Sequence, residues 1–441
     1  MKRFGRWFLP GMRVKRWLLL ILLGACFIGF GAFIVFSLDF QLFADNIQTI
    51  LYRITGTRLG PSLGGVLLIA GLMLILYATR RLAKSVAATM LPDSAQHLAD
   101  LFYQRRQLKR GPKLVVIGGG SGLSVLIRGL KQYTSNLTAI VTMADDGGSS
   151  GRLREELGTL PPGDIRNCIL AMANTEPTLQ KLFEYRFTEG SFAGHNFGNL
   201  FLVAMTAVND GNFEKAVQET SKVLAVGGQV FPSTLENVTL VAETQDGQLI
   251  RGESAIGHAH AKIRTLTLDP PHPNCMPEVL KAIQEADAVI LGPGSLYTSI
   301  IPNLLVLGIS EAITASAALT VYVCNMMVQP SETDYRKASD YIKTIMQFLD
   351  KDVLDYVIVN TGQVIEEWVK SYSKEGGAPV AADLETISKL GVKIVQNDYL
   401  KYQNYVRHDE IKLAEDIIEL VISEQYSLEQ RRDLAERLQK E

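Results

Sequence analysis

Residues 113–152 read KLVVIGGGSGLSVLIRGLKQYTSNLTAIVTMADDGGSSGR, and this stretch places a glycine-rich loop after each of two short apolar runs. The first run, residues 114–117, contains only Leu, Val and Ile, which is the pattern of a parallel strand buried on both faces. Residues 118–122 are GGGSG, and residues 123–131 then show helical apolar spacing. The stretch therefore predicts a buried strand, a tight glycine turn and a helix.

The glycine turn is a candidate phosphate site, formed by Gly119, Gly120, Ser121 and Gly122. Free backbone N–H groups and the positive end of a helix dipole meet at such a turn, and both favour an anion. The dinucleotide fingerprint needs glycine at its sixth position, which is Leu123 when Gly118 is counted first, so an NAD site is disfavoured. An ordinary ATPase is disfavoured as well, because no lysine follows the glycines at the spacing of the ATPase phosphate loop. We expect a nucleotide ligand of another kind.

Paired carboxylates follow the second apolar run, residues 137–143. Asp145 and Asp146 stand there, directly before the glycine and serine run 147–151. An Asp-Gly turn is the plainer interpretation of this segment. Two such loops on consecutive strand ends nevertheless favour a ligand site, because open α/β sheets bind ligands at the carboxyl ends of their strands.

A Pro-Pro-Gly turn at residues 161–163 precedes a helix that begins near Asp164. Arg166 and Asn167 follow at once, and a guanidinium with an amide near a helix start suits a phosphate or a polar base edge. Asp164 could equally cap the helix. Ligand binding and capping remain open for this segment.

Another polar segment, GHNFGNL at residues 194–200, opens an apolar helix. His195, Asn196 and Asn199 are costly to bury without partners, and their donors and acceptors would match a ribose or a pyrimidine. A turn with asparagine caps is the alternative interpretation.

A third strand-end loop carries Gly292, Gly294 and Ser295 directly after the buried run 288–291. Further strands are expected at residues 320–324 and 353–359. Repeated units of strand, polar loop and helix predict an α/β fold with a Rossmann-like, doubly wound and mostly parallel sheet. The runs 230–234, 238–243 and 249–253, the last two separated by a Gln-Asp-Gly-Gln turn, predict a small antiparallel insertion.

Two uncharged apolar runs lie near the N-terminus. Residues 17–38 and 61–78 are each near the ~20 residues that a bilayer-spanning helix requires. A cleaved signal peptide is the alternative for the first run, and a buried hairpin of a soluble core is the alternative for both. The close second run and the lack of an obvious cleavage site favour two transmembrane helices.

Basic residues set the expected orientation. Residues 1–16 contain no acidic residue but several basic ones: Lys2, Arg3, Arg6, Arg13, Lys15 and Arg16. Arg80, Arg81 and Lys84 follow the second run. Because lysine and arginine gather on the cytoplasmic side, both ends should face the cytoplasm, with the hairpin in the plasma (inner) membrane. Four scattered cysteines fit a reducing cytosol.

The chain of 441 residues divides into four expected parts. These are a membrane hairpin (1–80), a polar connector (81–111), a nucleotide-binding domain (112–400) and a charged helical tail (401–441). The apolar positions of the tail suit a surface helix or two, which could form a homo-oligomer contact. A net charge of -2 gives no reason to propose a nucleic-acid partner.

Five ordered motifs resemble those of one family. They are GGGSG (118–122), ADDGGSSGRLR (144–154), PPGDIRN (161–167), GHNFGNL (194–200) and GPGSLYTSIIPNLLV (292–306). Together they are similar to the gluconeogenesis-factor family, the bacterial relatives of CofD-like phospholactate transferases, over roughly residues 112–400. The hairpin lies outside the resemblance. A Rossmann-like nucleotide-binding fold is implied.

The resemblance also implies UDP-sugars such as UDP-N-acetylglucosamine as ligands, and a role in cell shape and in wall-precursor or carbon-flux control. Backbone amides at 119–122 and 292–295 would hold phosphates, while Asn196 and Asn199 would read ribose or base. Asp145 or Asp146 would hold a sugar hydroxyl or magnesium, since carboxylates bind Mg²⁺ through a few direct bonds while substrate phosphates supply the rest. The expected function is a membrane-tethered UDP-sugar-binding regulator.

Two alternatives stay open. The transferase relatives move a phospholactyl group from a nucleoside diphosphate carrier to a deazaflavin alcohol with magnesium, and Asp145 and Asp146 would be the catalytic residues of such an enzyme. A tethered scaffold for wall-synthesis partners would need no ligand, and the dense glycine and amide loops speak against it. Turnover distinguishes the transferase from the regulator.

Overall fold

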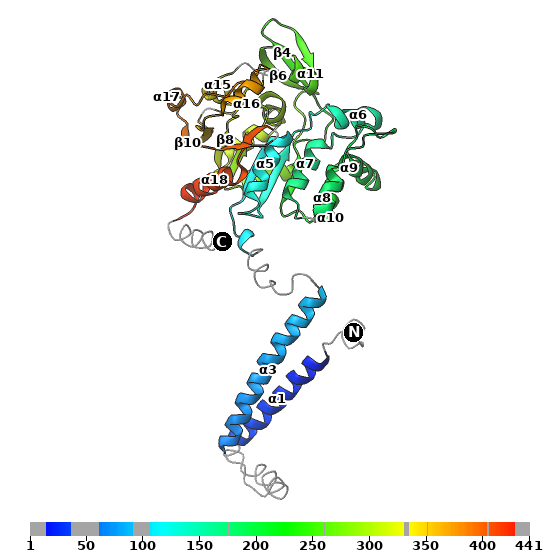
Figure 1. The fold of residues 1–441 in the computed structure, drawn as a ribbon, viewed down its shortest axis with the longest axis vertical. Coiled ribbons are helices and arrows are strands. Elements are labelled where there is room, and N and C mark those ends of the chain that lie inside the picture. Colours follow the sequence, from blue (N-terminus) through cyan, green and yellow to red (C-terminus); the bar gives the residue numbers. More distant parts are fainter. Residues whose placement is uncertain are drawn as a thin grey trace, which may run out of the picture. The chain divides into compact units, whose positions relative to one another are not determined.

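The structure is a computed structural model that describes residues 15–36, 61–90 and 106–427, with gaps at 175–176, 260, 330–334, 351, 375 and 404 (Figure 1). The chain forms two compact units, residues 1–104 and residues 105–441. The expected outer loop at 39–60, residues 91–105 of the connector and the end of the tail lie outside the described residues. Each unit is taken by itself below.

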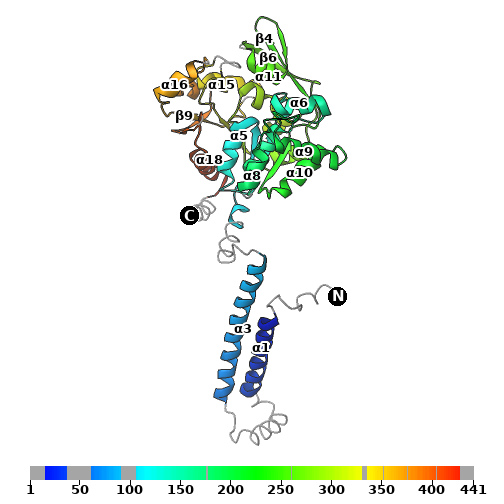
Figure 2. The same cartoon turned by 45° about the vertical axis from the view of Figure 1, so that its right-hand side comes forward.

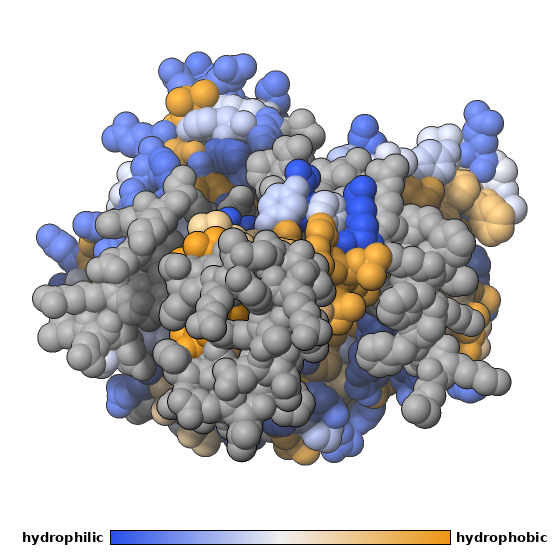
Figure 3. Space-filling view, turned by 90° about the horizontal axis from the view of Figure 1, so that it is seen from below, coloured by the Kyte–Doolittle hydropathy of each residue, from blue (hydrophilic) through white to orange (hydrophobic). Residues whose placement is uncertain are grey.

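The first unit contains two helices, α1 (Lys15–Phe36) and α3 (Pro61–Met90), which lie side by side in Figures 1 and 2. Both are long and apolar enough to cross a membrane. Their apolar stretches are only 17% and 11% buried, which does not fit the core of a soluble protein. Figure 3 colours one face of the molecule by hydropathy, from hydrophilic (blue) to hydrophobic (orange).

Glycine allows the two helices to pack closely. Gly24 faces Gly71, and Gly31 faces Gly64, at a spacing of seven residues along both helices. At one end of the pair, Trp17 and Tyr77 contact edge to face, and the Arg81 guanidinium lies 5.8 Å from the Trp17 ring centre. Aromatic and basic side chains of this kind are typical of the membrane–water interface.

The second unit is built on a sheet of seven parallel strands in the order β10-β9-β8-β7-β1-β2-β3. The strands are β1 (Leu114–Gly118), β2 (Leu137–Val141), β3 (Gln229–Pro232), β7 (Ala288–Leu291), β8 (Leu319–Val323), β9 (Tyr356–Asn360) and β10 (Lys393–Asn397). Every residue of β1, β2, β7 and β8 is buried, as unbroken apolar runs predict. The expected doubly wound, Rossmann-like fold is confirmed.

Helices connect these strands and cover the sheet. They are α5 (Gly120–Leu130), α6 (Gly148–Leu157), α7 (Gly163–Met172), α8 (Pro177–Glu184), α9 (Phe197–Val208), α10 (Phe213–Val223), α11 (Glu253–His258), α12 (Pro277–Gln284), η2 (Leu296–Ile300), α13 (Ile301–Leu304), α14 (Ile309–Ala315), α15 (Ala338–Ile345), α16 (Glu366–Ser373), α17 (Leu384–Ser388) and α18 (Glu410–Gln425). η2 is a short π-helix, a form that often marks functional sites.

A small antiparallel sheet, in the order β5-β4-β6, forms the insertion. Its strands are β4 (Thr239–Thr244), β5 (Leu249–Arg251) and β6 (Ile263–Asp269). The run 230–234, which the sequence assigned to the insertion, instead forms β3 at the edge of the parallel sheet, in register with β2. A short apolar run fits either sheet, so its partner is decided by the packing of the preceding helices.

The segment after residue 400 belongs to the second compact unit rather than standing apart as a tail. β11 (Leu400–Tyr402) and β12 (Val406–His408) pair antiparallel, and α18 then packs against α5. Leu413, Ile417 and Val421 of α18 are fully buried. A Cβ at Gly129 of α5 would overlap the Glu410 carbonyl oxygen, so glycine is needed for this close contact. The described part of the tail therefore contains the expected surface helix, which buries its apolar face against α5 and exposes charged residues such as Lys412, Glu415 and Glu419 on the other face.

Candidate functional site

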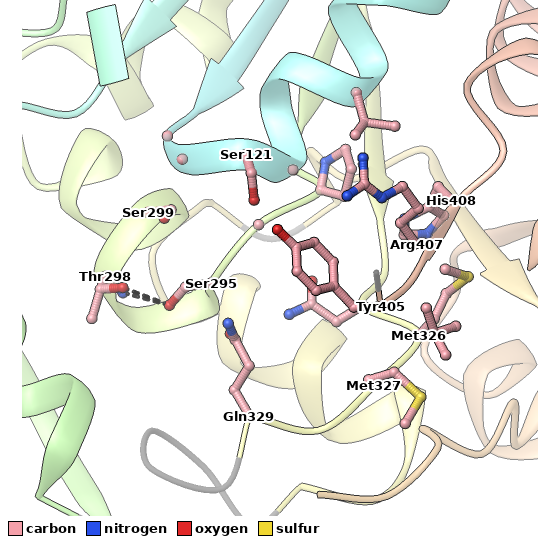
Figure 4. A pocket seen from close by; sticks show the side chains of 18 of the residues that line it. Ser121, Ser295, Thr298, Ser299, Met326, Met327, Gln329, Tyr405, Arg407 and His408 are labelled. Carbon is pink, nitrogen blue, oxygen red and sulfur yellow. Dashed lines mark hydrogen bonds between the residues drawn. The ribbon is translucent and has the colours of Figure 1, made fainter. Parts of the chain in front are cut away.

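β1 and β7 are neighbours in the sheet although they lie far apart in the sequence, and the strand order reverses between them. In open α/β sheets, ligands bind outside the carboxyl ends of the strands at such a switch point. A cavity of about 400 Å³ lies at this place (Figure 4). The side chains and loops around it come from β1, β7, β8, β12 and the insertion.

Two glycine loops form one side of the cavity: Gly119–Gly122 after β1, and Pro293–Ser295 after β7. The loops touch, because a Cβ at Gly122 would come within 2.5 Å of the Pro293 carbonyl oxygen. Gly120 has a φ of 64°, in the left-handed region that favours glycine. A side chain at Gly122 would therefore push the two loops apart.

Hydrogen bonds from hydroxyl and amide groups hold the second glycine loop, Pro293–Ser295, in place. The Ser295 hydroxyl accepts hydrogen bonds from the Thr298 backbone N–H at 3.1 Å and from the Thr298 hydroxyl at 2.7 Å. Asn303 is fully buried, and its amide donates to the carbonyl oxygens of Ser299 and Gly118 at 2.7 and 3.2 Å. Asn303 thus fixes the two glycine loops relative to each other.

The other walls contain residues that the sequence did not point to. They are Glu253, Asn325, Met326, Met327, Gln329, Tyr372, Tyr405, Arg407 and His408. In Figure 4, Arg407 and His408 lie on the opposite side of the view from Ser295 and Thr298. For Asn325 the sequence did contain a usable signal, because this polar residue follows the buried strand β8. The segment 405–408 carries no motif, and it reaches the cavity only through the β11–β12 pairing.

The cavity wall carries little formal charge. Among its described residues, Arg407 is the cation and Glu253 the carboxylate. The Arg407 guanidinium lies over the Tyr405 ring at 4.9 Å, and its Nε is buried with no hydrogen-bond partner in the described part of the chain. Burial lowers the pKa of His408 to about 4, so this side chain is neutral at physiological pH. An unsatisfied arginine beside glycine loops suits an anionic ligand.

A second polar cluster lies directly behind the Gly119 loop. A Cβ at Gly119 would come within 2.6 Å of the Asp164 carboxylate, which accepts a hydrogen bond from the Gly120 N–H. Burial, and then the charge of Asp145, raises the pKa of Asp164 to about 7. Burial likewise raises the pKa of Asp145, whose carboxylate accepts from the Gly147 N–H at 2.9 Å. Two partly buried carboxyl groups therefore share this cluster.

The neighbouring carboxylate, Asp146, has different partners. It accepts a hydrogen bond from the Ser254 N–H at 2.8 Å, at the start of α11 in the insertion. A Cβ at Gly252 would come within 2.5 Å of the Asp146 carboxylate. Asp145 and Asp146 are adjacent in sequence, yet the first is coupled to Asp164 and the second to the insertion.

A divalent cation fits the Asp145–Asp164 pair chemically, because a positive charge would relieve the burial and repulsion that raise both pKa values. Mg²⁺ typically takes one or two carboxylates and completes its coordination with phosphates and water. No group of three or more His, Cys, Asp or Glu side chains suited to a metal occurs in the described ranges. Phosphate oxygens would have to supply the other ligands.

Arg166 and Asn167 lie in the same cluster. The Arg166 Nη2 donates to the Asn167 side-chain oxygen at 2.6 Å, while its Nε and Nη1 are buried without a partner in the described residues. Burial, and then the charge of Arg186, lowers the pKa of Arg166 to about 10. The guanidinium remains charged at physiological pH.

His195, Asn196 and Asn199 converge on a serine and not on the cavity. The Ser149 hydroxyl lies 3.2 Å from the His195 Nδ1, and it accepts from the Asn199 amide at 3.2 Å. The Asn196 side chain caps α9 by accepting from the Asn199 N–H at 3.3 Å. Burial lowers the pKa of His195. The capping alternative for Asn196 therefore has its partner in the structure.

The candidate residues from the sequence thus fall into two groups. Gly119, Gly120, Ser121, Gly122, Gly294 and Ser295 line the cavity, with Gly292 just behind them. Asp145, Asp164, Arg166 and Asn167 form the cluster behind the first loop, and His195, Asn196 and Asn199 lie around Ser149. The Gly119–Gly120 backbone contacts both the cavity and the carboxyl cluster.

Comparison with known proteins identifies relatives along most of the chain. Residues 114–400 match the family described as 2-phospho-L-lactate transferase CofD. The gluconeogenesis factor of Bacillus subtilis is 44% identical over 312 residues, covering 70% of this chain and 98% of its own. A relative from Nostoc sp., also named for gluconeogenesis, is 44% identical over 416 residues, covering 93% of this chain and 91% of its own.

A solved structure shares the fold. The crystal structure of a Bacillus halodurans protein, described as a member of the UPF0052 family, has a TM-score of 0.68 and 44% sequence identity, covering 70% of this chain and 99% of that one. The resemblance drawn from the five sequence motifs is confirmed. The chain belongs to the CofD family, and within it to the gluconeogenesis factors.

Proposed function

We propose that the cavity binds a UDP-sugar such as UDP-N-acetylglucosamine, and that the protein is a membrane-tethered regulator that adjusts cell shape, wall-precursor supply or carbon flux to that ligand. The observation that carries the proposal is the position of Arg407 in the same cavity as two touching glycine loops. Backbone N–H groups and a guanidinium are the groups that hold a diphosphate.

The remaining walls suit the rest of a nucleotide. Met326, Met327, Tyr372 and Tyr405 offer apolar and aromatic surface for a base, and Asn325 and Gln329 offer amides for its polar edge. The Asn325 side-chain oxygen is buried without a partner among the described residues. Small-molecule sites are typically clefts of about 300–1,000 Å³ with a few placed polar groups, and this cavity fits that range.

The hairpin would act as the tether. Both helices are long and apolar enough to span a bilayer, and Trp17, Tyr77 and Arg81 gather at the end nearest the basic segments. With the basic segments in the cytoplasm, the nucleotide-binding unit would also lie there. A nucleotide sugar present in the cytoplasm would then reach the cavity directly.

Binding is tested by thermal unfolding of the full chain in detergent with UDP-N-acetylglucosamine, UDP, GDP and a buffer control. A ligand present at 100 times its Kd should stabilise the folded state by ~2.7 kcal/mol. Arg407→Gln should abolish the shift, whereas Arg264→Gln, which alters an exposed ion pair with Glu243, should preserve it. If no nucleotide shifts the transition of the wild type, the proposal fails.

The second candidate is the transferase, favoured by the Asp145–Asp164 pair next to the Gly119 loop. Magnesium held there would neutralise charge on a transferring phosphoryl group. The discriminating assay supplies a nucleotide-linked phospholactyl donor, a deazaflavin alcohol and magnesium to the purified chain. If the wild type forms product and Asp145→Asn abolishes this activity, the transferase function is correct and the regulator function is not.

A further inference from the structure

The insertion places one acidic side chain in the cavity wall. Glu253 is half-buried at the first position of α11, and it is the carboxylate among the described lining residues. The remaining elements around the cavity contribute backbone amides, hydroxyls, carboxamides, sulfur and the Arg407 guanidinium. An ionised carboxylate at this place repels free phosphate and attracts hydrogen-bond donors.

The backbone around Glu253 is held in place from two directions. Gly252 has a φ of 101°, which a residue with a side chain rarely adopts, and its N–H donates to the Leu240 carbonyl of β4 at 2.8 Å. Asp146 accepts from the Ser254 N–H at 2.8 Å, and Ile256 is buried one turn later. The position of Glu253 is therefore fixed by the loop after β2 as well as by the insertion.

The two chemistries of the cavity select different parts of a ligand. Glycine-loop amides and Arg407 favour phosphate oxygens. An ionised carboxylate only accepts hydrogen bonds, so it favours hydroxyl or amide donors. α11 also contacts η2, which begins directly after Ser295 of the second glycine loop, so Glu253 belongs to the phosphate-binding side. A free terminal phosphate would be repelled there, whereas a phosphate esterified with a sugar has one charge fewer and brings hydroxyl donors.

We propose that Glu253 accepts hydrogen bonds from the sugar of a nucleotide sugar and so selects glycosylated over free nucleoside diphosphates, with Asp146 as the positioning residue that holds it through the Ser254 N–H. The inference rests on the proposed function. It gives Asp146 a role that requires neither a metal nor catalysis.

Isothermal titration of the full chain in detergent, with UDP-N-acetylglucosamine and UDP as probes, tests this directly. The wild type should bind the sugar nucleotide at least about 10-fold more tightly than UDP, as expected for a hydrogen bond to a charged group. Glu253→Gln should weaken binding of UDP-N-acetylglucosamine about 10-fold and leave UDP unchanged or bound more tightly. Asp146→Asn should act in the same direction, and the double variant should be no weaker than Glu253→Gln, because both changes affect one contact.

Glu243→Gln is the matched control, since Glu243 lies on β4 of the same insertion, pairs with Arg264 and is absent from the cavity wall. It should bind both probes like the wild type. The proposal would be overturned if Glu253→Gln weakened the binding of both probes equally or changed the binding of neither. It would also be overturned if the effect of Glu253→Gln, measured in buffer with magnesium, disappeared in buffer with EDTA. Should Glu253→Gln fail to melt cooperatively, equal wild-type affinities for the two probes would still overturn it. A wild type that binds neither probe would overturn the proposed function, and this inference with it.

Discussion

Gly24 and Gly71 face each other across the helical hairpin at backbone contact distance. A Cβ at Gly24 would come within 2.9 Å of the Gly71 carbonyl oxygen, and a Cβ at Gly71 within 2.7 Å of the Gly24 carbonyl oxygen. Small residues that let helix backbones approach are the usual basis of helix packing in bilayers, where lipid removes the hydrophobic drive for association. The pair therefore fixes how closely α1 and α3 can pack.

Leucine at either position should push the helices apart. We expect Gly24→Leu or Gly71→Leu to lengthen the distance between spin labels at positions 22 and 73 by a few ångström, with a packing cost of about 1–3 kcal/mol. A Cβ at Gly29 or at Gly65 would meet no atom within 4 Å, so Gly29→Leu and Gly65→Leu serve as controls. An unchanged distance in Gly24→Leu would show that the glycines do not set the packing.

The orientation of the hairpin gives a second prediction. Single cysteines introduced for labelling of intact cells should react near residue 46, in the outer loop, and stay protected near Lys84. The reason is the gathering of basic residues before the first helix and after the second. The reverse pattern of labelling would exclude a cytoplasmic location of the second unit.

A third prediction concerns independence of the second unit. A chain beginning at Arg105 should fold without the hairpin, because the sheet and its helices form a compact unit with their own core. It should elute as a single species in size-exclusion chromatography with light scattering and melt in one cooperative transition. Aggregation without a transition would mean that the hairpin contributes to the core.

A fourth prediction follows from the buried histidine in the cavity wall. Because burial lowers the pKa of His408 from 6.5 to about 4, the unfolded chain binds an extra proton between these pH values. The contribution of His408 to stability is thus complete above about pH 6.5 and is lost as the pH falls towards 4, by at most about 3 kcal/mol.

Thermal unfolding from pH 7.5 to 4.5 measures this loss. His408→Gln should flatten the acid limb of the stability curve, whereas His258→Gln, which changes an exposed histidine on α11, should leave the limb as in the wild type. Parallel curves for wild type and His408→Gln would mean that other groups cause the acid sensitivity.

The sequence alone was sufficient to predict those parts of the site that depend on residues close together in the chain. The glycines at 118–122 and 292–294 directly follow apolar runs, so their position at strand ends could be predicted, and parallel pairing then brings the two loops together. Arg407 could not be found in this way. It reaches the cavity through the pairing of two three-residue strands, a contact that no local pattern encodes.

The carboxylates Asp145 and Asp146 show a second limit of prediction from the sequence. Asp145 and Asp146 look like one paired motif in the sequence, but their partners, Asp164 of α7 and Ser254 of α11, come from different elements. Which way each side chain turns depends on the packing of α7 and of the insertion. The prediction that residues 230–234 belong to the antiparallel insertion was wrong for a similar reason. The run forms β3, and its strand partner is set by tertiary packing.

The place of Arg407 and His408 near the end of the folded unit has a consequence for synthesis. The ribosome makes the glycine loop at 118–122 long before it makes β12, so the cavity lacks one wall until β12 has been made. A chain released early, after β10, would lack the Arg407 guanidinium and the α18 helix that packs against α5. A ligand bound in the proposed way would stabilise only chains that extend through β12, because Arg407 lies on that strand.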